Sequence, residues 1–386
     1  MLPQEQFVST EKTCWALSGF KPSKQIQLKI ACALSSLARR LEAIVALAAV
    51  GLLLAGPAES ADTPFSGPWI LDKEASTLNF QSVKNNALVE NNRFASYTGL
   101  IDEDGLATVK IQLDSIDTAI DLRNVRMRFL FFETYNFPEA IITARLDADA
   151  LRDLKTRRRM PYKLKFEMEL HGQKSELEAD IMVTLISDRL VSVSSAVPIP
   201  IAVKLFGMEE NVRKLEEAAK VTILPSGSVS FNFVFANAGI AGDELVVGAL
   251  APKETAVETK GNFTADACRG RFEILSRTGA IYFKTGSARI EPDSAPFLQA
   301  VSDIARRCPD LKILVSGHTD SDGDESLNQN LSDARADAVV DFLARIGIDS
   351  TQLRSIGYGE SRPVVPNDTP RNRGLNRRIE FSVFDG

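Results

Sequence analysis

Apolar and polar side chains alternate along several stretches between residues 69 and 236. In Val109–Leu113, Leu164–Leu170 and Val229–Phe235, every second residue is apolar and most of the residues between them are charged or polar. A period of two places the apolar side chains on one face of an extended chain. These runs predict half-buried antiparallel strands, and their short spacing predicts a β-sandwich or a β-barrel.

Phenylalanine is prominent on the predicted inward faces, at Phe166, Phe231 and Phe233. An eight-stranded barrel is wide enough either to fill itself with side chains or to hold one slender ligand. The alternation alone leaves both interpretations open: these rings form an ordinary core, or they line a tunnel.

A helical period follows near the carboxyl end. Apolar residues recur at i, i+3, i+4, i+7 and i+10, in Ala336, Val339, Val340, Leu343 and Ile346. Ser332 is a suitable N-cap and Gly347 a suitable terminator, so the spacing predicts a helix that begins after Ser332. Arg335 would then lie in the first turn, where the macrodipole disfavours a cation, and this suggests that a site uses its charge. A surface ion pair with Asp333 or Asp337 is the alternative.

An acidic turn precedes this helix. The apolar run Lys312–Val315 predicts a short strand that places Asp320 at the mouth of a loop. Three acids alternate there, Asp320, Asp322 and Asp324. A calcium-binding EF-hand needs Gly at its sixth position and Glu at its twelfth, where this chain has Glu325 and Leu331, so that interpretation is rejected.

Composition limits the classes of function. The chain has 386 residues, enough for two ordinary domains, and its formal net charge of −6 argues against a nucleic-acid partner. It has 2 histidines and no G-x-S-x-G motif, so His318 is interpreted as a structural loop residue. The sequence therefore does not predict an enzyme or a cofactor-dependent reaction.

The amino-terminal region predicts export. Residues Ala43–Gly56 are almost entirely apolar, and Arg39 and Arg40 precede them. This run is shorter than the roughly 20 residues that a spanning helix needs, but it fits the apolar region of a signal peptide. Residues 1–61 are therefore expected to be a leader, which is either cleaved as a signal peptide or retained as a membrane anchor.

Cysteine placement agrees with an oxidising compartment. Cys14 and Cys32 lie in the predicted leader, which leaves Cys268 and Cys308 in the remainder of the chain. An even pair in an exported protein predicts a disulfide between them, and two buried thiols are the alternative.

Five ordered blocks in the carboxyl-terminal region resemble the OmpA-like peptidoglycan-binding domain. They are Ile281–Ile290, Gly317–Asp320, Asn328 with Leu331–Ala336, Gly357–Glu360 and Asn376–Phe381. The resemblance implies that Asp320 binds the ammonium group of the diaminopimelate side chain and that Arg335 binds its carboxylate. Asn328 is included in the predicted site, mainly as a brace for the loop. Arg377 and Arg378 precede the alternating Ile379 and Phe381 of the last strand, so one of the two, here assigned as Arg378, is expected to support the site from behind.

The preceding region is similar to the YceI-like polyisoprenoid-binding family. The similar segments are Trp69–Asp72, Ser76–Phe80, Phe94 with Tyr97–Gly99, Leu113–Thr118, Arg123–Phe132, Phe137–Pro138 and Leu170–Gly172. The resemblance implies a lipocalin-like extended barrel with an isoprenoid tail, or a quinone, in an apolar tunnel lined by Phe166, Phe231 and Phe233. In the stretch Asn124–Arg128 the family usually carries a histidine, whereas this chain has Arg126.

Together these features predict a multidomain chain, in which an antiparallel lipocalin-like β-barrel (67–236) and a linker (237–270) precede an α/β OmpA-like domain (271–386). The expected function is non-enzymatic: the barrel binds an isoprenoid-like lipid and the last domain tethers the protein to peptidoglycan. The expected location is the periplasm, in association with the outer membrane or the cell wall. A purely structural anchor, whose barrel has a filled core or binds a protein, is the alternative.

Overall fold

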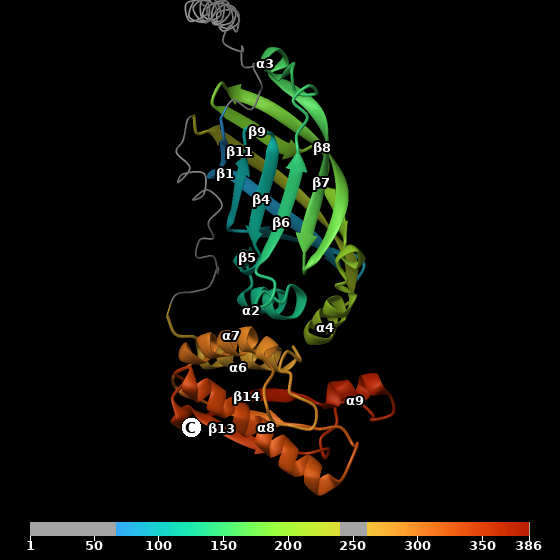
Figure 1. Cartoon of the computed structure of the whole chain (residues 1–386), viewed down its shortest axis with the longest axis vertical. Coiled ribbons are helices and arrows are strands. Elements are labelled where there is room, and N and C mark those ends of the chain that lie inside the picture. The colour runs from blue at the N-terminus through green and yellow to red at the C-terminus, as the bar shows by residue number, and fades with distance from the viewer. Residues whose placement is uncertain (1–66, 240–260, 386) are drawn as a thin grey trace, which may run out of the picture. The chain divides into compact units, whose positions relative to one another are not determined.

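The computed structural model describes residues 67–239 and 261–385, drawn in colour in Figure 1. The predicted leader, residues 1–61, lies outside the described residues, and so does most of the predicted linker. No helix among the residues that the structure describes is long and apolar enough to cross a membrane.

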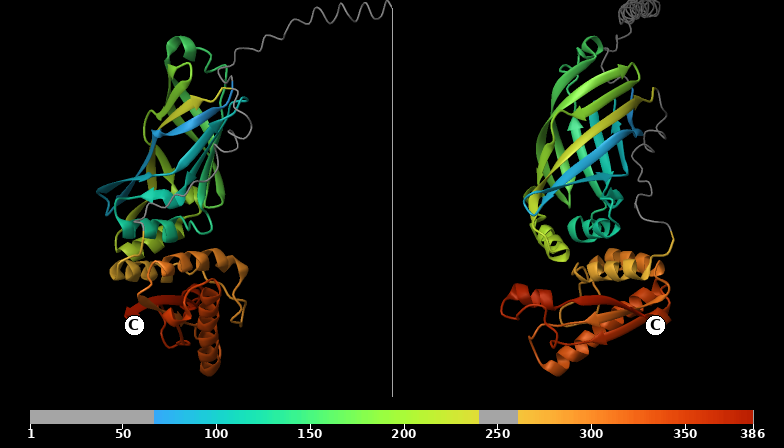
Figure 2. Two further views of the ribbon diagram at one scale, coloured as in Figure 1. Left: turned by 90° about the vertical axis from the view of Figure 1, so that its left-hand side faces the viewer. Right: turned by 180° about the vertical axis from the view of Figure 1, so that it is seen from behind.

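The first described region is a closed antiparallel barrel. Its strands are β1 (Trp69–Lys84), β2 (Leu88–Phe94), β3 (Tyr97–Ile101), β4 (Leu106–Gln112), β5 (Ile116–Asp117), β6 (Glu139–Arg145), β7 (Arg159–Leu170), β8 (Gln173–Ser187), β9 (Leu190–Ser195), β10 (Ile199–Ala202) and β11 (Ile223–Asn237). Eight of them form a ring in the order β1-β11-β9-β8-β7-β6-β4-β3, and the pairing of β1 with both β3 and β11 closes it. Outside the ring, β2 pairs with β1, β10 pairs with β11, and β5 pairs with β2. Figure 2 shows the ring from behind.

The predicted alternation matches this architecture. The three runs that suggested strands lie on β4, β7 and β11. His171 and Gly172, both with positive φ, form the tight turn between β7 and β8, as expected for a hairpin of twisted strands. The prediction of an antiparallel β-barrel is confirmed, and the ring of eight strands has the size that the sequence suggested.

Short helical segments connect the strands. They are η2 (Leu113–Ser115), α2 (Asp121–Arg126), the π-helical turn η3 (Met127–Phe131), α3 (Leu154–Arg157), η4 (Val203–Phe206) and α4 (Glu209–Ala219). α2 follows β5 after three residues, and some of its side chains line the barrel interior together with residues of β1 and β2.

The carboxyl-terminal region is a mixed α/β domain. Its three-stranded sheet has the order β13-β12-β14, with β12 parallel to β13 and antiparallel to β14. The elements are α6 (Ala265–Ser276), η5 (Pro292–Ser294), α7 (Ala295–Arg306), β12 (Leu311–Gly317), α8 (Glu325–Arg345), η6 (Ser350–Gln352), β13 (Leu353–Gly357), α9 (Pro370–Asn376) and β14 (Ile379–Asp385). Val315 of β12 and Val339 and Leu343 of α8 are fully buried where the helix packs on the sheet.

The predicted disulfide is confirmed. Cys268 lies in α6 and Cys308 follows α7, and the two side chains are bonded and buried. Cys268 was expected in the linker (237–270), but α6 begins at Ala265, inside that range. Thr264 explains this earlier start, because its side chain caps α6 by accepting a hydrogen bond from the Ala267 N–H (3.3 Å).

The predicted start of the long helix is wrong. α8 begins at Glu325, and its N-cap is Asp324, whose carboxylate accepts hydrogen bonds from the N–H groups of Ser326 and Leu327. The inward positions of its first turns include Asn328 and Ser332, which are buried but polar, so a hydrophobic period does not reveal them. Arg335 therefore lies in the interior of the helix, and an unfavourable macrodipole is not the reason for its importance.

Candidate functional site

The loop after β12 holds Asp320 in a buried position. Backbone hydrogen bonds fix this loop: the His318 N–H donates to the Arg378 carbonyl (3.0 Å) and the Thr319 N–H donates to the Gly359 carbonyl (2.9 Å). Asp320 is 5% exposed, and its carboxylate accepts a hydrogen bond from the Asp322 N–H (3.2 Å). The carboxylate is thereby held at a fixed position at the carboxyl end of the strand.

Two glycines let α8 approach the sheet closely enough to bring Arg335 to this loop. A Cβ on Gly317 would lie 2.2 Å from the Ser332 carbonyl oxygen, and a Cβ on Gly357 would lie 2.3 Å from the backbone nitrogen of Asp333. The Ser332 hydroxyl also accepts a hydrogen bond from the Gly359 N–H (2.8 Å). Backbone therefore packs on backbone here, and only glycine permits this spacing.

Arg335 is buried without a carboxylate partner. It is 9% exposed, its Nε donates to the Ser287 carbonyl (3.1 Å), and its guanidinium lies 5.0 Å from the centre of the Phe283 ring. Among the described residues, no acidic side chain forms an ion pair with it. Burial lowers the pKa of Arg335, the nearby Arg377 lowers it further, and Asp320 acts in the opposite direction. Such a guanidinium is well suited to bind an anionic group of a ligand.

Asn328 braces the acidic loop, as the sequence suggested. Its side-chain amide donates to the carbonyls of Asp320 (3.3 Å) and Asp322 (3.2 Å) and to the carboxylate of Glu360 (2.7 Å). The loop and the start of α8 are thus joined by one buried side chain. A direct contact of Asn328 with ligand stays a prediction.

Of the two neighbouring arginines before β14, the one that contacts the site is Arg377. Its guanidinium donates to the Asp320 carboxylate. Arg378, the residue predicted to support the site, instead pairs with Glu380 (2.6 Å) and donates to the carbonyl of Arg362 (3.1 Å). The side chains of adjacent residues in extended chain point in opposite directions, and the sequence does not say which of the two faces the loop.

His318 supports the loop from within the domain, in line with the predicted structural role. It is 2% exposed, stacks on Tyr358 with ring centres 5.4 Å apart, and lies 3.6 Å from the Glu380 carboxylate. His318 and Arg378 together hold the pKa of Glu380 at about 2, well below its usual value.

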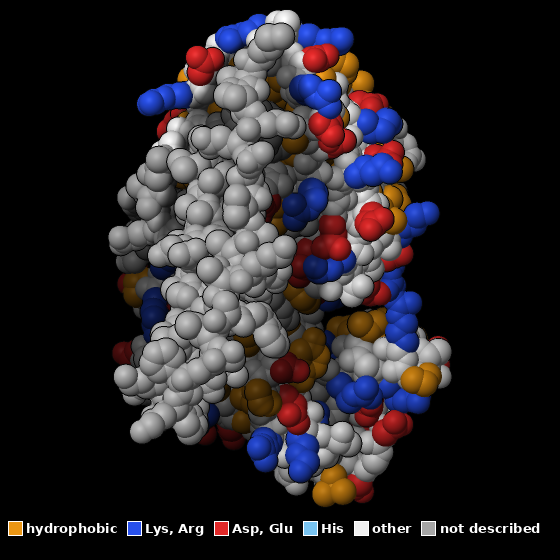
Figure 3. Space-filling view, turned by 45° about the horizontal axis from the view of Figure 1, so that its top comes forward, with side chains coloured by type: hydrophobic (Ala, Val, Ile, Leu, Met, Phe, Trp, Pro, Cys, Tyr) orange, Lys and Arg blue, Asp and Glu red, His pale blue; other side chains and the backbone are white. Residues whose placement is uncertain are grey.

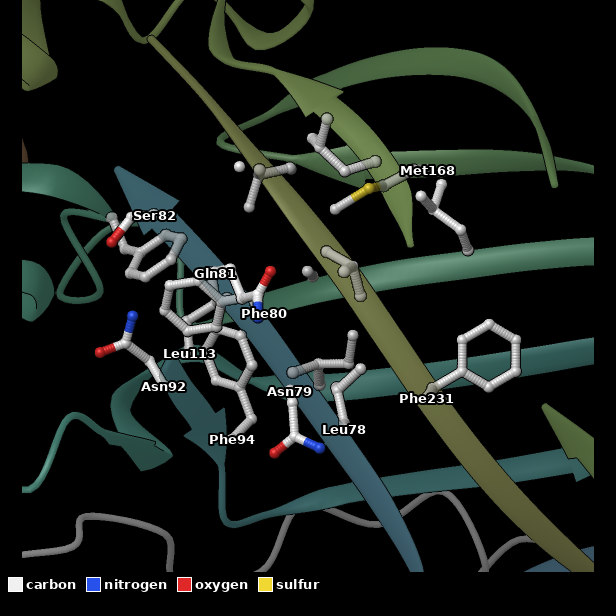
Figure 4. A pocket seen from close by; sticks show the side chains of 18 of the residues that line it. Leu78, Asn79, Phe80, Gln81, Ser82, Asn92, Phe94, Leu113, Met168 and Phe231 are labelled. Atoms are coloured by element: carbon white, nitrogen blue, oxygen red, sulfur yellow. The ribbon is translucent and has the colours of Figure 1, made fainter. Parts of the chain in front are cut away.

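The barrel encloses an apolar cavity of about 440 Å³. All three predicted phenylalanines, Phe166, Phe231 and Phe233, line it. Phe231 and Phe233 stack on each other with ring centres 4.7 Å apart, and Figure 4 shows Phe231 among the lining side chains of β1 and β11. The interior is therefore hollow as well as apolar, which favours a tunnel over a filled core; that these phenylalanines contact a lipid stays a prediction.

Arg126 departs from the pattern of the family, but the sequence did not predict that charged side chains line this cavity. Its lining includes Lys84, Glu90, Arg123 and Arg126. One feature of the sequence could have indicated them: Arg123 and Arg126 are three residues apart, so they lie on one face of a helix.

The match of two family models identifies the two regions. The model of the YceI-like domain matches residues 69–235, and that of the OmpA family matches residues 282–377. The chain joins a YceI-like domain to an OmpA-family domain. Both predicted resemblances are confirmed.

Curated relatives match the OmpA-family domain. The Peptidoglycan-associated lipoprotein of Buchnera aphidicola is 30% identical over 117 residues, which are 30% of this chain and 68% of the relative. Outer membrane porin F of Pseudomonas aeruginosa is 35% identical over 33% of this chain and 37% of its own length. The Peptidoglycan-binding protein ArfA of Mycobacterium tuberculosis is 35% identical over 27% and 32%, respectively. The match with these last two relatives spans only about a third of their length.

Solved structures resemble each domain separately. A polyisoprenoid binding domain from Saccharophagus degradans is 29% identical, with a TM-score of 0.42, and the match covers 44% of this chain and 98% of that one. The peptidoglycan-associated lipoprotein from Burkholderia pseudomallei is 26% identical, with a TM-score of 0.26, over 27% of this chain and 88% of that one.

Proposed function

We propose that this protein is an exported, non-enzymatic component of the bacterial cell envelope, in which the YceI-like barrel carries an isoprenoid-like lipid and the OmpA-family domain tethers the protein to peptidoglycan. No chemical step is involved. The periplasm is the location that suits both partners, in association with the outer membrane or the cell wall.

The cavity in the barrel is the observation that carries the lipid half of the proposal. Its volume of about 440 Å³ lies within the usual range of ligand pockets, and most of its lining is aliphatic or aromatic. A filled barrel of this strand number has no such space. Burial of apolar surface contributes roughly 25 cal/mol per Å², so a long hydrocarbon tail would gain many kcal/mol by entering it.

The geometry of Asp320 and Arg335 supports the peptidoglycan half. A diaminopimelate side chain ends in an ammonium and a carboxylate, so it needs one anionic acceptor and one cationic, fork-shaped donor. Both groups are fixed and more than nine-tenths buried, Asp320 by its loop and Arg335 by the close packing of α8. Named relatives of the OmpA-family domain are peptidoglycan-binding or peptidoglycan-associated proteins, which agrees with this assignment.

Two measurements on the purified full-length protein test the proposal. Native mass spectrometry of protein from a bacterial envelope should show a bound mass that solvent extraction identifies as an isoprenoid lipid. Sedimentation with purified sacculi should carry the protein into the pellet. Barrels that are always empty, or that copurify only with a protein, would favour the purely structural anchor.

A further inference from the structure

The charged side chains that line the cavity lie at one end of it. Lys84 is the last residue of β1, Glu90 lies on β2, and Arg123 and Arg126 lie on α2. The other described residues that line the cavity are apolar or uncharged. The cavity therefore has the polarity of an amphiphile, with a long apolar part and one charged end.

Glu90 forms ion pairs with two of the three cationic side chains, Lys84 and Arg123. The Arg123 guanidinium lies 2.9 Å from Oε1 of Glu90, and the Lys84 ammonium pairs with the same oxygen. All three side chains are less than a quarter exposed. Three cations thus line the cavity beside one carboxylate.

Arg126 has no carboxylate partner among the described residues. It follows Arg123 by three positions, on the same face of α2, and its Nε is buried without a hydrogen-bond partner. A buried, unsatisfied polar atom costs free energy, and a charged one costs more. A ligand that accepts hydrogen bonds would remove this cost.

Asn92 is a second unsatisfied group at the same end. It lies two residues after Glu90 on β2, is 6% exposed, and its Oδ1 has no hydrogen-bond partner. Figure 4 shows its amide beside Phe94, which stacks on Phe80 with ring centres 5.3 Å apart. The stacked rings of Phe80 and Phe94 thus lie next to the polar end of the cavity.

The outer surface of the barrel is different. Figure 3 shows basic and acidic side chains interspersed on the face in view. Lysines on the outer surface pair with acids there, as in Lys163–Asp180 (3.4 Å) and Lys174–Glu167 (2.8 Å). On the outer surface these lysines have acidic partners, whereas the cavity has three cations beside one carboxylate.

We propose that the lipid carried by the barrel has a phosphate head group, which Arg126 binds together with Arg123 and Asn92, while its isoprenoid tail occupies the apolar part of the cavity. This inference rests on the lipid-carrier function proposed above and narrows it to prenyl phosphates. A phosphate oxygen accepts hydrogen bonds from a guanidinium bidentately, and a protonated one can donate to Asn92 Oδ1. A quinone or a prenyl alcohol is neutral and leaves the excess positive charge uncompensated.

The test compares ligands that share one tail. Binding of geranylgeranyl phosphate, geranylgeraniol, a ubiquinone with a tail of the same length, and inorganic phosphate to the delipidated full-length protein is measured by native mass spectrometry and calorimetry. We expect the prenyl phosphate to bind at least tenfold more tightly than the alcohol or the quinone, and inorganic phosphate to bind weakly. Arg126→Gln should reduce this preference to below threefold by weakening the binding of the prenyl phosphate, and Arg126→Lys should restore part of it.

Arg152→Gln is the matched control, because Arg152 is exposed on the outer surface and pairs with Asp149 (2.7 Å). It should keep the full preference, and circular dichroism should show the same fold for every variant. Equal binding of phosphate, alcohol and quinone to the unmodified protein would overturn the inference while leaving the carrier function intact. A preference that survives in Arg126→Gln, or inorganic phosphate that competes as well as the lipid, would overturn it too. Binding of none of the lipids would refute the carrier function itself, and the inference with it.

Discussion

Asp320 and Arg335 are both more than nine-tenths buried, yet they do not pair with each other. Asp320 accepts a hydrogen bond from Arg377, and Arg335 donates to the Ser287 carbonyl. The two opposite charges are held apart by different elements, the loop after β12 and the helix α8. In the proposed function, this separation lets each charge meet one end of a zwitterionic ligand.

Replacement of either charge should abolish binding to sacculi. Loss of one partner from a buried, charged hydrogen bond costs about 2 to 5 kcal/mol, so Asp320→Ala and Arg335→Ala should each weaken binding well over tenfold. Sedimentation with purified sacculi measures this. Arg345→Ala, on the same helix but exposed, is the control and should bind normally. Normal sedimentation of both site variants would refute the assignment.

Addition of a methyl group at Gly317 should lower the stability of the domain, because Gly317 packs closely against Ser332. Gly317→Ala would place a Cβ 2.2 Å from the Ser332 carbonyl oxygen, so α8 must move away from the sheet. Overpacking of this kind typically costs about 1 to 3 kcal/mol. Thermal unfolding of the variant should show the loss, together with weaker binding to sacculi, because Arg335 moves with the helix.

Gly374→Ala is the comparison for that experiment. A Cβ there meets its nearest neighbour, the side chain of Arg377 just after α9, at 3.7 Å, which is an ordinary contact. The substitution should be neutral or slightly stabilising, since alanine is the better helix former. Equal stability of both variants would contradict the close packing described for Gly317.

Reduction of the Cys268–Cys308 disulfide should destabilise the OmpA-family domain. The bond joins residues 40 positions apart, and closure of a loop of that length contributes roughly 4 kcal/mol in the chain-entropy model. The double variant Cys268→Ser/Cys308→Ser should unfold at lower denaturant concentration than the oxidised protein. An unchanged midpoint, with the bond verified by peptide mapping, would show that the unfolded chain gains little freedom from its removal.

The low pKa of Glu380 predicts how stability depends on pH. Its pKa falls from 4.5 to about 2 in the folded protein, first through His318 and then through Arg378. The contribution is therefore present above about pH 4.5 and is lost as the pH falls toward 2. The difference in Tm between the unmodified protein and Glu380→Gln should shrink over this interval. A difference that stays constant would show that the carboxylate does not titrate in this way.

Substitution of Phe231 distinguishes between a barrel interior that holds lipid and one that is a dry core. If lipid occupies the cavity, Phe231→Trp fills space that the tail needs, so bound lipid should decrease while Tm changes little. In a filled core the same substitution overpacks the interior and costs about 1 to 3 kcal/mol. Extractable lipid and Tm are measured on the same preparation, and a destabilised variant of a protein that never carried lipid would contradict the proposal.

The barrel was predictable from sequence because a half-buried strand repeats every two residues, and β4, β7 and β11 show this period clearly. The cavity was not, because side chains such as Phe231 alternate in the same way whether they fill a core or line a tunnel. Volume depends on how eight strands close around one another, which no local pattern records.

In the OmpA-family domain, the motifs named the side chains of the candidate site, whereas helix geometry gave the wrong start for α8. The inward positions of α8 near the loop are Asn328, Ser332 and Arg335, and all three are buried and polar. Because the amino-terminal half of α8 contributes polar residues to the site, it lacks the apolar period from which a helix is predicted. For the same reason the sequence could not choose between Arg377 and Arg378, whose orientations follow from the entry into β14.

The central claim is that one protein holds lipid and cell wall at the same time. The most direct measurement sediments the full-length protein, isolated with its native lipid, together with purified sacculi and extracts the washed pellet with organic solvent. The account predicts an isoprenoid lipid in the pellet, close to one molecule per protein and absent when Asp320→Ala replaces the unmodified chain. A pellet that contains the protein but no isoprenoid lipid would contradict it.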